Sequence, residues 1–176
     1  MTRKTFLDDS SSDDDSDGEE PIKKYKIIVI GDYKVGKSSL ISRIRNNEFS
    51  LLYTSTKCIE IFTNIKMGDI VIDIWDIPPH ICKYYNIDSL KSDAIILMFD
   101  SNSKYTLNNG FDIFKQIHNK LYNTVTPELW VAYRGKKIDI IEECHPDRLF
   151  QIDSLTNEGF LDLIYDIRSN LLRRIH

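Results

Sequence analysis

The sequence has few of the features that mark secreted, membrane-spanning or disulfide-rich proteins. Its three cysteines, Cys58, Cys82 and Cys144, are widely spaced and form no C-x-x-C pair. An odd, scattered set favours free thiols in a reducing compartment over a disulfide framework. No apolar run approaches the roughly 18 residues of a membrane span, and the N-terminus turns acidic where a signal peptide needs a hydrophobic stretch. These absences predict a soluble intracellular protein, in the cytoplasm or alternatively the nucleus.

Excess charge of either sign is scarce outside the first twenty residues, because acidic and basic side chains nearly balance in the rest of the chain. The first twenty residues hold eight acidic and two basic side chains, so the chain's net charge of −4 leaves +2 for the remainder. A nearly neutral folded part argues against a nucleic-acid-binding surface. The chain has 176 residues, 41% of them hydrophobic, which suits one globular domain, over residues 23–176.

Residues 1–22 form an acidic, serine-rich tail that cannot bury enough apolar surface to become ordered. We therefore predict a disordered segment. A binding arm for a basic partner is one interpretation. A phosphorylation cluster for an acidophilic kinase is another, because each of its four serines has an acidic residue three positions later. Composition alone favours a third, a solvating tail with no specific partner.

Glycine is also sparse, with seven in the chain, yet two of them lie in one motif. Residues 31–38 read G-D-Y-K-V-G-K-S and fit the phosphate-binding pattern G-x-x-x-x-G-K-[ST]. The glycines let backbone N–H groups turn toward an anion, Lys37 supplies charge to the outer phosphates, and the Ser38 hydroxyl ligates Mg²⁺. The predicted phosphate-binding residues are Gly31, Asp32, Tyr33, Lys34, Val35, Gly36, Lys37, Ser38 and Ser39.

Strand and helix patterns alternate after the tail, which predicts an α/β protein with a largely parallel sheet. The apolar runs at 25–31 and 94–100 are typical of strands buried on both faces. Two further strands, 59–66 and 70–76, are expected to form a hairpin, and a short strand is expected at 129–133. Helices are predicted over 37–45, 107–121 and 158–175.

A phosphate loop on an α/β sheet could belong to a small-molecule kinase, an ATPase or a GTPase. Phe49 lies eleven positions after Ser38, and Thr56 lies eighteen after it. This spacing, the strand 72–76 that ends in Asp76, and the segment 99–109 resemble the Ras superfamily of small GTPases, in particular Rab and Ran proteins. The resemblance covers roughly residues 24–175. It implies the P-loop NTPase fold of small GTPases, with a mostly parallel six-stranded sheet, one antiparallel strand and helices on both faces.

The resemblance also implies roles for individual residues. Phe49 would pack on the guanine of GTP or GDP, and Thr56 would close on Mg²⁺ and the γ-phosphate. Mg²⁺ would be held by Ser38 and Thr56 directly and by Asp76 through water, since hard cations prefer oxygen ligands. A kinase would leave Phe49, Thr56 and Asp139 unused.

The base-binding motif of the family corresponds to residues 136–139, where Lys136 replaces the usual asparagine. Asp139 would accept hydrogen bonds from guanine, and Lys137 would lie along the ring. Ser154 matches the serine of the fifth motif, whose following N–H, that of Leu155, would read the guanine O6. Each of these residues also has a plainer interpretation. Lys137 and Asp139 would form a solvated loop pair and Ser154 a helix cap, while Asp76 would be a turn former.

Three departures bear on catalysis. His80 stands where the family has the glutamine that orients the attacking water, so it is the candidate catalytic residue. Pro79 replaces a glycine and has no N–H with which to sense the γ-phosphate. Tyr33 occupies a loop position where Ras-like proteins need a very small residue. We therefore expect slow GTP hydrolysis.

Two further departures from the family concern the spacing of its last two motifs and the C-terminal residues. Asp139 and Ser154 are only fifteen positions apart, which predicts that the helix before the last strand is truncated. The chain ends at His176 with no C-terminal cysteine, so we expect neither prenylation nor an intrinsic membrane anchor.

Two functional hypotheses remain open. One is a soluble molecular switch in signalling or trafficking, in which GTP orders the switch regions and protein effectors read them. The other is a pseudo-GTPase, an adaptor module whose partner recognition does not depend on nucleotide turnover. Tyr33, Pro79 and His80 motivate the second hypothesis.

Overall fold

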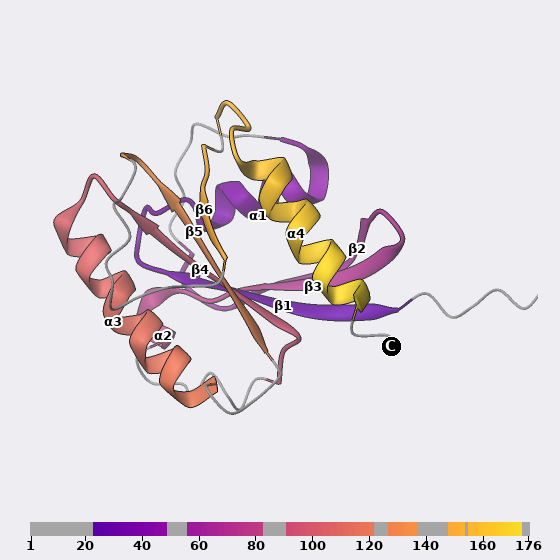
Figure 1. The fold of residues 1–176 in the computed structure, drawn as a ribbon, viewed down its shortest axis with the longest axis horizontal. Helices are drawn as coiled ribbons and strands as arrows, with labels where there is room; N and C mark the ends of the chain where they lie inside the picture. The colour runs from indigo at the N-terminus through magenta and orange to yellow at the C-terminus, as the bar shows by residue number, and fades with distance from the viewer. Residues whose placement is uncertain are drawn as a thin grey trace, which may run out of the picture.

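The computed structural model describes residues 23–48, 56–82, 91–121, 127–136, 148–153 and 155–173. The acidic tail and the segment predicted to hold the truncated helix lie outside these ranges. A central sheet flanked by helices forms the described part of the molecule (Figure 1).

Six strands form the sheet, in the spatial order β2-β3-β1-β4-β5-β6. In chain order they are β1 (Lys24–Gly31), β2 (Glu60–Met67), β3 (Ile70–Asp76), β4 (Ala94–Asp100), β5 (Glu128–Arg134) and β6 (Leu149–Gln151). β2 runs antiparallel to β3, and the other neighbouring pairs are parallel. The predicted mostly parallel six-stranded sheet with one hairpin is therefore confirmed.

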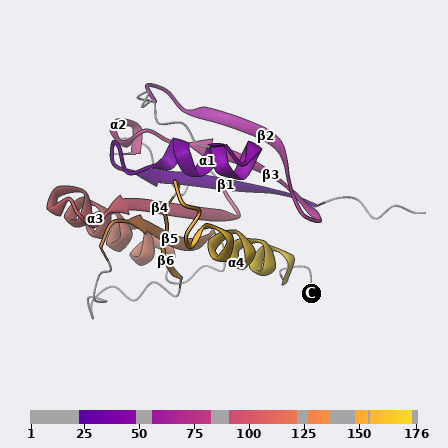
Figure 2. The ribbon, with the colours of Figure 1, turned by 90° about the horizontal axis from the view of Figure 1, so that it is seen from above.

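Helices cover both faces of this sheet, as predicted. Helices α1 (Lys37–Asn46) and α4 (Phe160–Arg173) contribute to one hydrophobic cluster, and α3 (Lys104–Leu121) to the other, which the side chain of Ile81 in the short α2 (Pro79–Cys82) also joins. Seen from above, α1 lies along β1 (Figure 2), and α4 is joined to β5 by the hydrogen bond between Asp166 and Trp130.

The apolar run of β1 explains why both faces are covered. Because successive side chains point to opposite faces of a strand, Ile27 and Val29 enter one cluster while Ile28 and Ile30 enter the other. All four are at most 1% exposed. A strand that is apolar on both sides requires helices on both sides.

Helix α3 begins earlier than the predicted residue 107. The Ser103 hydroxyl accepts a hydrogen bond from the N–H of Thr106 at 3.4 Å, which caps the helix and lets it start at Lys104. The apolar spacing marks the buried face of the helix, whereas the cap fixes its first residue.

A partly buried polar network joins β5, the residue before β6 and α4. The indole N–H of the fully buried Trp130 donates to Asp166 Oδ2 at 2.7 Å. Arg148 lies over the Trp130 ring, 4.5 Å from its centroid, and pairs with Glu128 and Asp166. The network fixes the last strand and the last helix on the sheet.

Asp166→Ala should lower the free energy of unfolding by about 1–3 kcal/mol, because it leaves the buried indole N–H without its acceptor. Urea unfolding followed by tryptophan fluorescence measures this loss. Asp112→Ala, at an exposed position of α3, is the control and should change stability by no more than about 0.5 kcal/mol. Equal effects of the two variants would contradict the role given to Asp166.

No helix in the described part of the chain is long and apolar enough to cross a membrane.

The parallel strands β1, β3, β4 and β5 all end at one edge of the sheet. In open α/β sheets ligands bind at this carboxyl edge. The predicted site residues lie at this edge: Gly31 ends β1, Asp76 ends β3, and others lie in the loops that follow the strands.

Candidate functional site

The loop between β1 and α1 wraps around the carboxyl edge of the sheet. Its first glycine, Gly31, has φ +145°, and a Cβ there would lie 2.1 Å from the carbonyl oxygen of Met98 on β4. Gly36 has φ +103° at the start of α1. Both positions exclude a side chain or strain one, so the glycines of the motif are required by the local backbone.

Lys37 is buried inside this loop, with 7% of its surface exposed. Its ammonium group donates to the carbonyl oxygens of Gly31 and Asp32 at 3.1 and 2.9 Å. The loop therefore closes around a positive charge at the N-terminus of α1, an arrangement that attracts anions.

Asp32 braces the loop. Its carboxylate accepts a hydrogen bond from the N–H of Tyr33 at 2.7 Å and another from the Asn109 side chain of α3 at 2.9 Å. The side chain of Asp32 is thus turned toward α3, and any contribution to phosphate binding would come from its backbone. Asn109 was not predicted to support the site, because its contact depends on how α3 packs.

The three predicted metal-binding residues lie together. The Ser38 hydroxyl donates to Asp76 Oδ2 at 3.1 Å, and the Thr56 hydroxyl donates to the same oxygen at 3.3 Å. The two hydroxyl oxygens are 3.3 Å apart. Residues separated by eighteen and twenty positions along the chain therefore meet next to Lys37.

Asp76 is fully buried, and burial raises the pKa of its carboxyl group. The charge of Lys37 and the hydrogen bonds from Ser38 and Thr56 lower that pKa and oppose the effect of burial. Its second oxygen, Oδ1, has no hydrogen-bond partner among the described residues. A buried carboxylate with an unused oxygen is suited to a cation or to a water molecule held by one.

The donor set fits Mg²⁺. Two hydroxyls and a carboxylate are hard oxygen ligands, and few protein ligands suffice because Mg²⁺ retains several waters. The described part of the chain contains no group of three or more His, Cys, Asp or Glu side chains that could hold a different metal.

Asp76→Asn should stabilise the metal-free chain, raising its melting temperature by about 2–4 °C, because the neutral amide removes a charge that is costly to bury. The same variant should lose the further stabilisation that Mg²⁺ with GDP gives the unaltered chain. Differential scanning fluorimetry with and without Mg²⁺ and GDP measures both effects. Asp112→Asn is the control, and the metal assignment is wrong if both variants respond to Mg²⁺ and GDP like the unaltered chain.

Tyr33 and His80 meet above the phosphate loop. The Tyr33 hydroxyl lies 3.0 Å from His80 Nδ1, and the two rings are nearly parallel, with centroids 6.5 Å apart. His80 belongs to α2, whose first residue is Pro79. The candidate catalytic residue is therefore joined to the loop residue that departs most from the Ras pattern.

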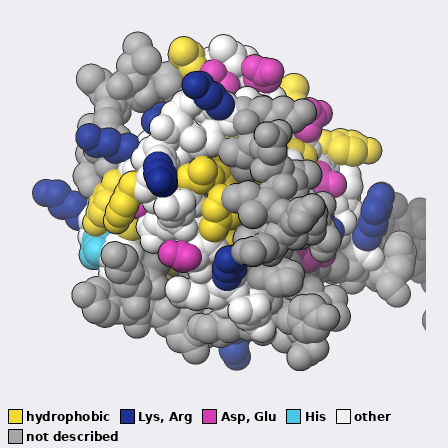
Figure 3. Space-filling view, turned by 60° about the vertical axis from the view of Figure 1, so that its left-hand side comes forward, with side chains coloured by type: hydrophobic (Ala, Val, Ile, Leu, Met, Phe, Trp, Pro, Cys, Tyr) yellow, Lys and Arg dark blue, Asp and Glu magenta, His cyan; other side chains and the backbone are white. Residues whose placement is uncertain are grey.

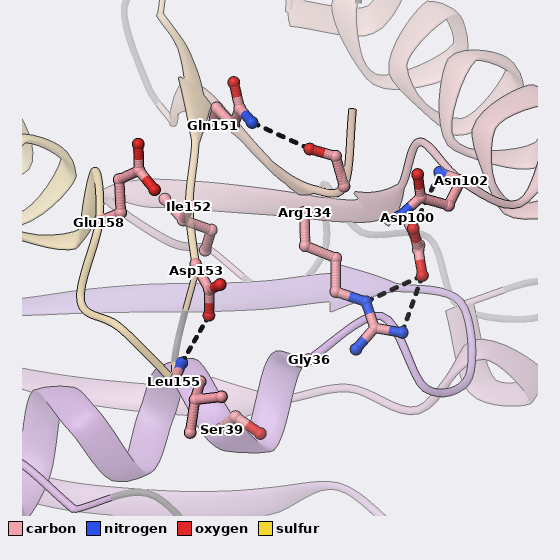
Figure 4. Close-up of a pocket in the computed structure, with 11 residues that line it drawn as sticks. Gly36, Ser39, Asp100, Asn102, Arg134, Gln151, Ile152, Asp153, Leu155 and Glu158 are labelled. Carbon is pink, nitrogen blue, oxygen red and sulfur yellow. Dashed lines mark hydrogen bonds and ion pairs between the residues drawn. The ribbon is translucent and has the colours of Figure 1, made fainter. Parts of the chain in front are cut away.

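A cleft of about 470 Å³ continues from the phosphate loop along the carboxyl ends of β4, β5 and β6 (Figure 4). Its lining residues are Gly36, Ser39, Asp100, Asn102, Arg134, Gly135, Gln151, Ile152, Asp153, Leu155 and Glu158. The two ends of a nucleotide require such neighbouring sites, one for phosphates and one for a base.

Three of the predicted residues, Gly36, Ser39 and Leu155, line this cleft. The N–H of Leu155, which the family resemblance assigns to the guanine O6, donates to Asp153 Oδ1 at 2.7 Å. Phe49, Lys137, Asp139 and Ser154 lie outside the described residues. Their predicted roles stay predictions.

Lys136, the substitution in the base motif, is fixed through its backbone. Its N–H donates to the Asn102 side chain at 3.3 Å, and its carbonyl accepts from the Ser101 hydroxyl at 2.6 Å. The end of β4 thus positions the start of the base loop. The described side chains on the face of the molecule drawn in Figure 3 are a mixture of basic, acidic and apolar ones.

At the carboxyl edge of the sheet, a loop bounded by two glycines surrounds a buried lysine, and two hydroxyls and a carboxylate lie beside it. This arrangement defines a nucleotide-binding protein of the P-loop class. Comparison with known proteins narrows the class. Residues 26–133 match the family described as Roc, Ras of Complex, domain of DAPkinase. The chain belongs to the Ras superfamily of small GTPases.

Rab-like relatives are similar over much of the chain. Rab-32D of Dictyostelium discoideum is 33% identical over 107 residues, which is 57% of this chain and 46% of the relative. RABA1c of Arabidopsis thaliana is 33% identical over 122 residues, or 66% and 54% of the two chains. Rab-28 of Caenorhabditis elegans is 25% identical over 142 residues, or 77% and 55%. The chain therefore spans about half the length of these relatives.

Proposed function

We propose that this chain binds GTP and GDP with Mg²⁺ and acts as a molecular switch whose GTP hydrolysis is slow. The observation that carries the proposal is the contact between Tyr33 and His80 above a closed phosphate loop. The loop retains the parts that hold phosphate, while the residues expected to support hydrolysis engage one another.

Phosphate binding follows from Lys37. Its buried ammonium can exchange the carbonyl oxygens of Gly31 and Asp32 for phosphate oxygens, which carry more negative charge. Ser38, Thr56 and Asp76 would hold Mg²⁺, which neutralises the charge that develops between the β- and γ-phosphates.

Slow hydrolysis follows from the chemistry of His80. A glutamine amide offers a water molecule both a donor and an acceptor. A neutral imidazole has one of each, and Nδ1 is already within hydrogen-bond distance of the Tyr33 hydroxyl. The remaining ring nitrogen can donate to a water or accept from it, but it cannot do both.

Pro79 adds a second impairment. It begins α2, is buried and has no N–H. The family's hydrogen bond from this position to the γ-phosphate therefore has no donor. We infer that α2 responds weakly to the difference between GTP and GDP.

The segment around Thr56 is then the principal reporter of the nucleotide. Its hydroxyl already lies against Ser38 and Asp76, so a shared Mg²⁺ and the γ-phosphate would hold the segment in place. Protein effectors that read this segment are the expected partners.

A binding module without turnover is the second candidate. The Tyr33 ring, 44% exposed above the phosphate loop, favours it, because the ring occupies space that a water-positioning residue and a partner's arginine would need. In this case partner recognition would not depend on hydrolysis.

One experiment separates the candidates. One sample of the purified chain is denatured, and any nucleotide that it releases is identified by chromatography. A second, folded sample is loaded with GTP, and its γ-phosphate release is followed under single-turnover conditions with Mg²⁺. The switch proposal expects GDP or GTP affinity with slow phosphate release. No measurable affinity for either nucleotide would exclude the switch. Release at the intrinsic rate usual for the family would exclude impaired hydrolysis.

A further inference from the structure

One basic side chain lies among the acidic side chains of the described residues that line the cleft beyond the phosphate loop. Asp100, Asp153 and Glu158 contribute carboxylates, and Arg134 is the only basic residue among the described residues of the lining. This charge disfavours a phosphate group in the cleft, because three carboxylates outweigh one guanidinium. It suits a base edge that presents both donors and acceptors.

Arg134 is held in a fixed position. Its Nε and Nη2 atoms both contact Asp100 Oδ2, at 2.9 and 2.7 Å. Asp100 is itself oriented, because its Oδ1 accepts a hydrogen bond from the N–H of Asn102 at 2.9 Å. The guanidinium is therefore preorganised although half of the Arg134 side chain, 51%, is exposed.

The Arg134 side chain extends from β5 toward Gly36, at the junction of the cleft and the phosphate loop (Figure 4). Its remaining terminal nitrogen, Nη1, has no hydrogen bond to any residue in the described ranges. Nη1 and the second N–H of Nη2 thus remain as donors on the side of the guanidinium away from Asp100, held by a rigid support.

The cleft also needs a donor for a base oxygen. The N–H of Leu155, which the family would use for the guanine O6, is bound to Asp153 at 2.7 Å. The Gln151 amide nitrogen donates to the carbonyl of Gly135 at 2.9 Å. Among the lining residues that the structure describes, Arg134 is the one that offers a charged, paired set of side-chain donors.

We propose that Arg134 is a specificity-determining residue, whose Nη1 and the second N–H of Nη2 donate as a fork to the O6 and N7 acceptors of a guanine base. Arginine matches this pair of acceptors in nucleic-acid recognition, whereas adenine replaces O6 with an amino donor that an arginine repels. The assignment rests on the proposed nucleotide-binding function. Asp100 acts as the positioning residue that orients the fork.

The test measures the affinity of the full chain for GDP, IDP and 7-deaza-GDP at fixed Mg²⁺ by calorimetry. IDP keeps the O6 and N7 acceptors of GDP, while 7-deaza-GDP lacks N7. In Arg134→Met, GDP and IDP should each bind about tenfold more weakly, the loss of a base-reading contact. The loss for 7-deaza-GDP should be smaller, because one of its acceptors is already missing.

Two variants serve as controls. Arg173→Met makes the same change at an exposed position of α4 and should alter no affinity. Arg134→Lys keeps the charge but not the fork, so it should resemble the methionine variant in its discrimination between GDP and 7-deaza-GDP.

Each other outcome counts against the proposal. Equal losses for all three ligands would mean that Arg134 shapes the cleft without reading the base. Unchanged or tighter GDP binding in Arg134→Met would mean that the side chain only fills the cleft. In both cases the proposed function stands. Failure of the unaltered chain to bind GDP would overturn the proposed function together with this assignment.

Discussion

Replacing Lys37 with alanine is expected to weaken GDP and GTP binding by at least about a hundredfold, since two charge-assisted hydrogen bonds contribute roughly 1.5–3 kcal/mol each. The ammonium group is buried inside the phosphate loop, where it contacts the carbonyl oxygens of Gly31 and Asp32. Its removal takes away the charge without changing the course of the backbone.

Fluorescence titration with a labelled guanine nucleotide measures the loss. Lys66→Ala, on the exposed side of β2, removes the same charge far from the loop and should leave the affinity unchanged. Circular dichroism and thermal unfolding establish that both variants fold. Unchanged affinity in Lys37→Ala would show that the nucleotide does not occupy this loop.

Restoring the residues typical of the family should raise the rate of GTP hydrolysis. The triple variant Tyr33→Gly, Pro79→Gly and His80→Gln is expected to hydrolyse GTP at least about tenfold faster, because positioned groups that orient a nucleophile contribute a hundredfold or more. The measurement is γ-phosphate release in a single turnover, which separates chemistry from nucleotide exchange.

Single variants distinguish the contributions to this effect. His80→Gln alone should gain little, because the Tyr33 ring still lies above the loop. Tyr33→Phe removes the 3.0 Å contact to His80 Nδ1 but keeps the ring, so it separates the hydrogen bond from the bulk. Tyr165→Phe, at a position of α4 that is 69% exposed, is the matched control. If the triple variant is no faster than the unaltered chain, the residues that limit hydrolysis lie elsewhere.

Five of the six strands and most helices could be placed because their patterns are local, whereas the short β6 (Leu149–Gln151) could not. The apolar runs of β1 and β4 need no knowledge of the tertiary structure to be identified as strands buried on both faces. The proximity of Ser38, Thr56 and Asp76 could also be predicted, since the three keep the family's spacing, and their binding of Mg²⁺ stays a prediction. The structure brings these three residues within hydrogen-bond distance of one another.

Contacts across the sheet could not be predicted in this way. Asp100 pairs with Arg134 because the register of β4 and β5 places them side by side, 34 positions apart in sequence. Asn109 reaches Asp32 only because α3 packs on the sheet. Such pairs depend on register and helix docking, which a single sequence does not specify. The predicted contacts of Phe49 and Asp139 with the base still await a direct test.

The crowded backbone at Gly31 affects how this motif responds to mutation over evolutionary time. A side chain at Gly31 would collide with the Met98 carbonyl whether or not the chain had any use for a nucleotide. Purifying selection for folding alone would therefore retain this glycine. Lys37 is different, because a buried ammonium is costly to keep in a fold that has no anion to bind. Among drifting descendants of this chain, loss of Lys37 would be the first sign that nucleotide binding had been abandoned, while Gly31 would persist.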